Sequence, residues 1–286
     1  IAAMGAIPVF TDIDPKTYNI SLDSIEKALK NPKVKIKALI PVHLYGQCAD
    51  MDGVLNIAKK NNLKVIEDNA QAFGAEYLPA GQVGQGKKAG TMGDCGTVSF
   101  FPGKSLGGFG DAGMVLTNDP DIESKLKILR NQGNKDKYYH LVLGYNNRVD
   151  TLQAAILKVK LKYLDGWNKR RQANADYYNQ YFKSLKIKIP FVPEGNTHIY
   201  HQYTIRLDIS SVELMNHLNS TCIDARVYYP VPLHLQECFK YLGYQKGDFP
   251  ESEKAAAEVL SIPVYPDLSQ EQLDYIVNSV KEYFKK

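Results

Sequence analysis

The stretch KALIPV at residues 37–42, followed by DGVLNIAKKN at 52–61 and LKVIED at 63–68, decides the fold. The first and third runs are short and apolar, which is typical of buried strands. The middle run has its apolar residues at helical spacing, with Val54, Leu55 and Ala58 on one side. A strand, a helix and a second strand in this order predict parallel pairing with a helix packed on the sheet.

The same alternation extends on both sides of this unit. Ser21 is a suitable N-cap for the helical pattern that follows it. Strands are predicted at residues 7–10, 96–101 and 113–117, and helices at residues 21–30 and 120–130. We therefore expect an α/β fold whose sheet is mainly parallel.

The second half of the chain has a different pattern. Residues 150–184 carry a proline-free helical pattern that would span roughly 50 Å, as in a helix that bridges two domains. A strand is then predicted at 203–207, with helices at 212–218 and 270–284. The predicted domains are a large domain at 1–165, a connecting helix at 166–185 and a small α+β domain at 186–286.

Composition excludes several classes of function. The net charge is +4, from 35 basic and 31 acidic residues that are interspersed, which gives no reason to expect a nucleic acid or membrane partner. No apolar run approaches the length of a membrane-spanning helix. The 4 cysteines and 6 histidines are dispersed, so we expect no metal site and a reducing, cytoplasmic location.

Two glycine motifs are misleading. GFGDAG at 108–113 has the spacing of a dinucleotide fingerprint, but the run that follows it is β-like rather than helical. GKS at 103–105 resembles the end of a P-loop, but Val98 stands where that motif needs its other glycine. A dinucleotide oxidoreductase therefore stays a disfavoured alternative, and nucleotide hydrolysis is less favoured still.

An acid and an amine carry the functional prediction. Asp68 ends an apolar run, and the carboxyl ends of strands are where open α/β sheets bind ligands. Lys104 lies in the glycine-rich turn FPGKSLGG at 101–108. Pyridoxal phosphate (PLP) needs a lysine for its aldehyde and an acid for its ring nitrogen. A turn aspartate and a surface lysine are the alternative interpretations.

Other polar residues are weaker candidates. Gln71 could reach the same ligand, and the Ser99 hydroxyl could hold its phosphate. The polar segment YNNR at 145–148 precedes the long helix and could bind phosphate, or could simply surround a capping Asp150. His43, Tyr45 and His201 are candidate substrate contacts, although the histidines could equally belong to the core or to loops.

Together these segments resemble the DegT-type nucleotide-sugar aminotransferases, which have the fold type I, aspartate aminotransferase-like architecture. The resemblance covers essentially the whole chain, with the motifs in the order and spacing of the family. It is carried by GAIPVF (5–10), PVHLYGQ (41–47), VIEDNAQAFGA (65–75), SFFPGK (99–104), GYNNRVDTLQAA (144–155), YHQY (200–203) and LSIPVYP (260–266).

The resemblance implies a role for each matched residue. Lys104 would be the Schiff-base lysine, Asp68 the partner of the ring nitrogen, Gln71 a contact of the phenolic oxygen and Ser99 a phosphate contact. Asn146, or alternatively Asn147, would reach the phosphate in the neighbouring subunit, so the active sites of a homodimer would be shared. Glutamate and a nucleotide-linked keto-sugar would be the substrates, and cell-surface amino sugars the eventual use.

The resemblance also separates branches of the family. A branch with histidine in place of the lysine comprises sugar dehydratases, which Lys104 disfavours. The PGKSLG segment at 102–107 followed by GDAG at 110–113 looks like the branch that acts on 3-keto sugars. Family members have several tens of residues before the segment that matches Ile1, so the N-terminal part of the large domain is expected to be missing. A PLP-fold regulatory protein without turnover is the main rival.

Overall fold

The computed structural model describes residues 1–32, 34–79, 81–82 and 84–285. Its central sheet has the order β1-β2-β5-β6. The strands are β1 (Ala38–Leu39), β2 (Lys64–Asp68), β5 (Cys95–Ser99) and β6 (Gly113–Leu116). β2 is parallel to both β1 and β5, and β6 is antiparallel to β5. The predicted α/β class with a mainly parallel sheet is therefore confirmed.

Two capped helices precede β2 in the chain; the second packs on the sheet, and the first packs against the second. The Ser21 side chain accepts a hydrogen bond from Ser24 N at the start of α1 (Leu22–Leu29), as predicted. Asp50 does the same for Gly53 N at the start of α2 (Met51–Lys60). Val54 on α2 and Val65 on β2 belong to one buried apolar cluster, which holds α2 against the sheet.

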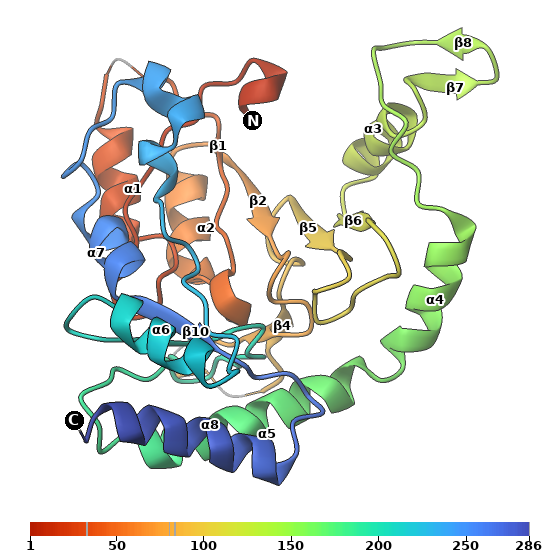
Figure 1. Ribbon diagram of the computed structural model, residues 1–286. Helices are drawn as coiled ribbons and strands as arrows, with labels where there is room; N and C mark the ends of the chain where they lie inside the picture. The colour runs from red at the N-terminus through yellow and green to blue at the C-terminus, as the bar shows by residue number, and fades with distance from the viewer. Residues whose placement is uncertain (33, 80, 83, 286) are drawn as a thin grey trace.

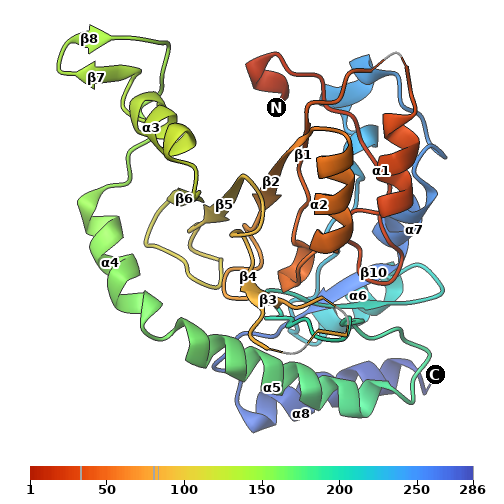
Figure 2. The same ribbon diagram turned by 180° about the vertical axis from the view of Figure 1, so that it is seen from behind.

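The chain then leaves the sheet as an arm, which we define as residues 120–161. The arm contains α3 (Pro120–Leu129), the strands β7 (Asn134–Asp136) and β8 (Tyr139–His140), and α4 (Thr151–Leu161). Figures 1 and 2 show the arm standing away from the rest of the molecule on the side of β6. α4 buries only Leu157, so most of its apolar residues are exposed.

The prediction of one continuous helix over residues 150–184 was wrong. The structure has α4 and a separate α5 (Leu164–Phe182), with Lys162 and Tyr163 between them. Neither residue at the break is proline or glycine, and Gly166 lies three positions further on, in the first turn of α5. The break lets α5 bury Tyr178 and Phe182 in another core while α4 continues the arm.

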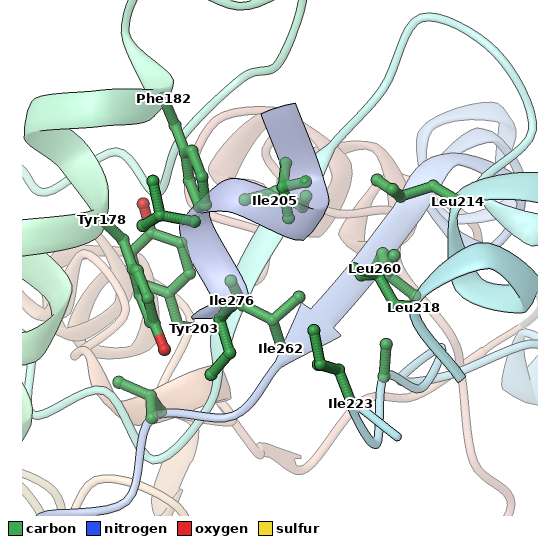
Figure 3. Packing of buried hydrophobic residues seen from close by; sticks show 14 of the residues in the cluster. Tyr178, Phe182, Tyr203, Ile205, Leu214, Leu218, Ile223, Leu260, Ile262 and Ile276 are labelled. Carbon is green, nitrogen blue, oxygen red and sulfur yellow. The ribbon is translucent and has the colours of Figure 1, made fainter. Parts of the chain in front are cut away.

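The C-terminal part forms a second core. β9 (Tyr203–Arg206) pairs antiparallel with β10 (Val259–Ile262), and α5 packs beside α8 (Gln270–Tyr283). Figure 3 shows the side chains of this core converging on the two strands. The labelled residues include Tyr178, Phe182, Tyr203, Ile205, Leu214, Leu218, Leu260 and Ile276. The predicted strand at 203–207 and the helices α6 (Val212–Ser220) and α8 are confirmed.

Several short elements complete the fold. The sequence did not predict β3 (Glu76–Tyr77), β4 (Lys87–Lys88), the helix α7 (Pro250–Glu258) or the short 3-10 helices. The 3-10 helices are η1 (Ala2–Met4), η2 (Leu44–Gly46), η3 (Leu233–Leu235) and η4 (Glu237–Leu242). No helix in the described ranges has the length and apolar character needed to cross a membrane.

The strand predicted at residues 7–10 is absent. Phe10 instead packs its ring at 5.3 Å from Phe239, and its backbone N–H donates to the Tyr244 hydroxyl at 3.3 Å. Nearby, the Asp12 carboxylate accepts from Glu251 N at 2.9 Å and Ser252 N at 2.8 Å, in the first turn of α7. Tertiary contacts with the C-terminal part therefore replace strand pairing in this segment.

Candidate active site

Asp68 occupies the position that the sheet provides for a ligand. It is the last residue of β2, whose neighbours β1 and β5 both run parallel to it. Its backbone N–H donates to Pro41 O and its carbonyl accepts from His43 N, both at 2.9 Å. Its side chain accepts from Ala70 N at 3.0 Å. The backbone of Asp68 is therefore held firmly while its carboxylate lies at the carboxyl edge of the sheet.

Lys104 comes to the same edge through the adjacent strand. Asp68 is in register with Thr97 on β5, and the chain turns shortly after β5, with Lys104 N donating to Phe101 O at 2.9 Å. Burial lowers the pKa of the Lys104 amine, and the nearby Asp68 carboxylate opposes part of that shift. The predicted acid and amine are thus brought together, and the amine is more easily neutral than an exposed lysine.

Glu67 points to the opposite side of β2 and is completely buried. Its carboxylate accepts from Gly90 N at 2.8 Å, from Met92 N at 2.5 Å and from Gly93 N at 2.6 Å. Burial alone would raise the pKa of Glu67, but the hydrogen bonds from His43 and from these backbone groups lower it. Glu67 therefore anchors the loop before β5 and, through its place in β2, fixes the strand that presents Asp68.

His43 belongs to this buried arrangement. Its Nε2 lies 2.9 Å from Glu67 Oε2, and its Nδ1 accepts from Ala49 N at 3.1 Å. Because both ring nitrogens are occupied and the residue is 0% exposed, the geometry does not fit the substrate contact expected of His43. It fits the alternative of a core histidine.

Gln71 connects three segments at the site. Its Oε1 accepts from Tyr45 N at 2.7 Å, and its Nε2 donates to the Tyr229 hydroxyl at 2.9 Å. Tyr45 is 5% exposed and its own hydroxyl donates to Tyr228 O, so its side chain does not fit the expected substrate contact. Tyr45 instead orients the Gln71 amide through its backbone. Tyr229 was missed in the sequence, because no local motif marks it.

His201 lies near Lys104 and Arg171. Its Nδ1 is buried and has no hydrogen-bond partner among the described residues. Burial, and then the positive charges of Lys104 and Arg171, lower the pKa of His201 to about 3. The imidazole is therefore neutral at physiological pH and has an unpaired polar atom. Arg171, whose guanidinium donates to Tyr200 O at 3.2 Å, was also missed.

The remaining candidates occupy two different places. Ser99 ends β5, and its hydroxyl accepts from Phe101 N at 3.3 Å, at the entrance to the Lys104 turn. Asn146 is exposed and lies on the arm, where its backbone bridges to Asn131. No contact recorded for the described residues joins Asn146 to Asp68 or Lys104 in the same chain.

The described residues offer no metal site. No group of three or more His, Cys, Asp or Glu side chains in the described ranges is arranged to hold a metal ion. A hollow of about 700 Å³ lies between the starts of α1 and α2, away from Lys104. Asp50, one of the acidic residues in its wall, accepts from Gly53 N and the Tyr77 hydroxyl, so it is engaged within the fold.

The residues at the sheet edge fit the chemistry of PLP. Lys104 offers an amine with a lowered pKa, and Asp68 offers a carboxylate beside it. Gln71 has a second amide hydrogen to donate. The Ser105 hydroxyl and His201 Nδ1 are buried and unpartnered among the described residues, as polar atoms that await a ligand would be.

The sheet order and this pairing of lysine and acid at its edge define a fold type I aminotransferase. Comparison with known protein families narrows this class to one family. The model of the DegT/DnrJ/EryC1/StrS aminotransferase family matches residues 1–281. The chain belongs to this family.

Individual relatives match along the whole chain. It is 47% identical over 288 residues to the pleiotropic regulatory protein of Geobacillus stearothermophilus, covering 100% of this chain and 74% of that protein. It is 40% identical to the UDP-N-acetyl-3-dehydro-alpha-D-glucosamine 3-aminotransferase of Acidithiobacillus ferrooxidans, covering 97% and 72%. The solved structure of DesV from S. venezuelae superposes with a TM-score of 0.92 at 36% identity, covering 100% and 74%.

Proposed function

We propose that this protein is a PLP-dependent aminotransferase that moves an amino group from glutamate to the ketone of a nucleotide-linked sugar. The observation that carries the proposal is the meeting of Lys104 and Asp68 at the ends of two adjacent strands, with the pKa of Lys104 lowered. Relatives of the whole chain are named as transaminases of dTDP-linked or UDP-linked 3-amino sugars. We therefore infer a 3-keto sugar, of the 6-deoxyhexose type, as the acceptor.

The chain supplies orientation and proton transfer. When bound, PLP supplies the electron sink that the reaction needs. The Lys104 amine, whose pKa is lowered by burial, would bind the aldehyde of the cofactor and would then move the proton at the substrate carbon. The Asp68 carboxylate would keep the ring nitrogen protonated. Ser99 would offer a hydroxyl to the phosphate, and Gln71 would offer an amide hydrogen to the ring.

We also propose that the protein is a homodimer that associates through the arm. Asn146 is exposed on the arm, and so are many large apolar side chains. They include Tyr138, Tyr139, Leu141, Val142, Leu143, Leu152, Val159 and Leu161. An exposed apolar surface this extended is typical of an interface. A second copy covering the arm would bury this apolar surface and bring Asn146 to the partner's site.

We also propose that the protein works in the cytoplasm.

A regulatory function without turnover is the second candidate. It is favoured by the name of the Geobacillus relative, which is a pleiotropic regulatory protein. The presence of both Lys104 and Asp68 favours the enzyme, because an amine and a carboxylate for the ring nitrogen are the two groups that PLP chemistry needs from a protein. The dehydratase alternative is disfavoured because Lys104 stands where that branch has histidine.

Absorption spectroscopy tests the proposal. Purified protein with PLP should absorb near the yellow band of the bound cofactor and should bleach when glutamate is added. Lys104→Ala should abolish both the covalent attachment and turnover while the fold, followed by circular dichroism, is unchanged. A yellow protein whose spectrum does not respond to glutamate would favour the regulatory function, and amino transfer by the alanine variant would reject the role of Lys104.

A further inference from the structure

The turn that carries Lys104 is closed by its own backbone. Gly108 N donates to Phe100 O at 2.8 Å, and this hydrogen bond joins the two ends of the turn. A side-chain carbon on Gly107 would collide with Pro102 O, so glycine is needed where the chain approaches itself. The position of Lys104 therefore depends on how the second half of the turn is held.

Gln153 on helix α4 holds the second half of the turn. Its Oε1 accepts from Phe109 N at 2.8 Å, directly after the turn. A side-chain carbon on Gly108 would lie 2.9 Å from this oxygen, and one on Gly110 would lie 3.0 Å from Gln153 Nε2. The first two glycines of the pattern at 108–113 therefore leave room for the amide of Gln153 to lie against the backbone.

Two further residues of α4 contact the same turn. Leu157 is buried in one apolar cluster with Phe100 and Leu106, which lie on either side of residue 104 in the sequence. The Lys160 amine donates to Gly107 O. Leu157 and Lys160 stand at i+4 and i+7 from the glutamine, so one face of the helix contacts the turn at three points.

We propose that Gln153 is a positioning residue that holds the Lys104 turn so that the lysine amine can reach the aldehyde of PLP. This inference rests on the proposed function, because it concerns the attachment of its cofactor. Attachment joins the neutral amine nitrogen to the aldehyde carbon, and the amine hydrogens leave with the aldehyde oxygen as water. The rate of such a step depends steeply on approach, since a displacement of about 1 Å can cost about a hundredfold.

Two substitutions separate the hydrogen bond of Gln153 from the rest of its side chain. Gln153→Met keeps the length of the side chain and removes the acceptor, whereas Gln153→Glu keeps an acceptor for Phe109 N. Gln272→Met is the matched control, because it loses a hydrogen bond of the same kind elsewhere. Gln272 Oε1 accepts from Ser269 N at 2.9 Å at the start of α8, which packs in the C-terminal core.

Two ligands of the apoprotein distinguish positioning from a general loosening of the site. PLP attaches to Lys104, so the growth of the yellow absorbance gives the rate of attachment. Pyridoxamine phosphate has an amine in place of the aldehyde, so it occupies the same site without attaching, and calorimetry gives its affinity. Rates are compared on the plateau reached at high pH, where the lysine amine is neutral in every variant.

The expected result is selective. Gln153→Met should slow attachment about tenfold and change the affinity for pyridoxamine phosphate by less than about twofold. Gln153→Glu should attach PLP within about threefold of the wild-type rate, and Gln272→Met should change neither quantity. An unchanged rate in Gln153→Met, equal losses with both ligands, or the same slowing in Gln153→Glu or Gln272→Met would overturn the inference. Wild-type protein that binds neither ligand would instead refute the proposed function.

Discussion

Replacing Glu67 by glutamine should destabilise the protein strongly, although the two side chains have nearly the same shape. In the wild type, one carboxylate oxygen faces Met92 N and Gly93 N, and the other faces Gly90 N and His43 Nε2. A glutamine can present its carbonyl oxygen to only one of these pairs, and its NH₂ group then faces two buried donors. Leaving a buried donor unsatisfied costs about 1–3 kcal/mol, so we expect a loss of about 3 kcal/mol.

Urea denaturation measures this loss. Trp167, the single tryptophan, provides the fluorescence signal. An unchanged slope of the unfolding free energy against urea concentration would show that only the stability has changed. Glu76→Gln is the matched control, because Glu76 pairs with Lys88 at a partly exposed site, where such a pair contributes at most about 1 kcal/mol. A loss below about 1 kcal/mol for Glu67→Gln would refute the reasoning.

The same variant has a pH signature. Because the pKa of Glu67 is lowered in the folded protein, its ionisation contributes stability above the pKa of an unfolded glutamate, about 4.3. This contribution is lost as the pH falls through the lower value of the folded state. The gap in stability between the wild type and Glu67→Gln should therefore be constant near neutral pH and shrink in acid. A gap that widens in acid would contradict the assignment.

Two further predictions concern the cofactor and the arm. Asp68→Ala should reduce turnover by several orders of magnitude while PLP still attaches to Lys104. The reason is that the ring nitrogen loses the carboxylate that keeps it protonated. A loss of turnover under tenfold would count against the pairing of Asp68 with the ring nitrogen. Leu152→Glu should convert a dimer to a monomer in sedimentation velocity and abolish activity, whereas Ile209→Glu, at an equally apolar exposed position off the arm, should do neither. A dimeric Leu152→Glu variant would place the interface elsewhere.

The parts of the structure that could be predicted are those with local signals. The spacing of Val54 and Ala58 predicts α2, and Ser21 predicts the start of α1, because caps and apolar faces are set by neighbouring residues. Asp68 and Lys104 could be chosen as partners because the ends of parallel strands meet at one edge of a sheet. Their proximity follows from topology alone, before any side-chain detail.

The parts that could not be predicted depend on contacts between distant residues. Tyr229 reaches Gln71 across 158 positions, and no property of its neighbours in the sequence marks it. The break between α4 and α5 falls at Lys162 and Tyr163, neither of which is proline or glycine, while Tyr178 further along α5 is buried in a core made with distant residues. His43 was open to two interpretations because only the position of Glu67 shows that its ring is fully engaged.

The contact between Asp12 and the start of α7 has a consequence for how the molecule is made. The two partners are separated by 240 positions, so a nascent chain holds Asp12 for most of its synthesis before Ser252 leaves the ribosome. Until then the carboxylate is bound by water, and the segment around Phe10 has no aromatic neighbours to pack against. The segment around Phe10 and Asp12 therefore packs only after Ser252 has emerged, and a protease or chaperone that binds unpacked chain can act on it during that interval.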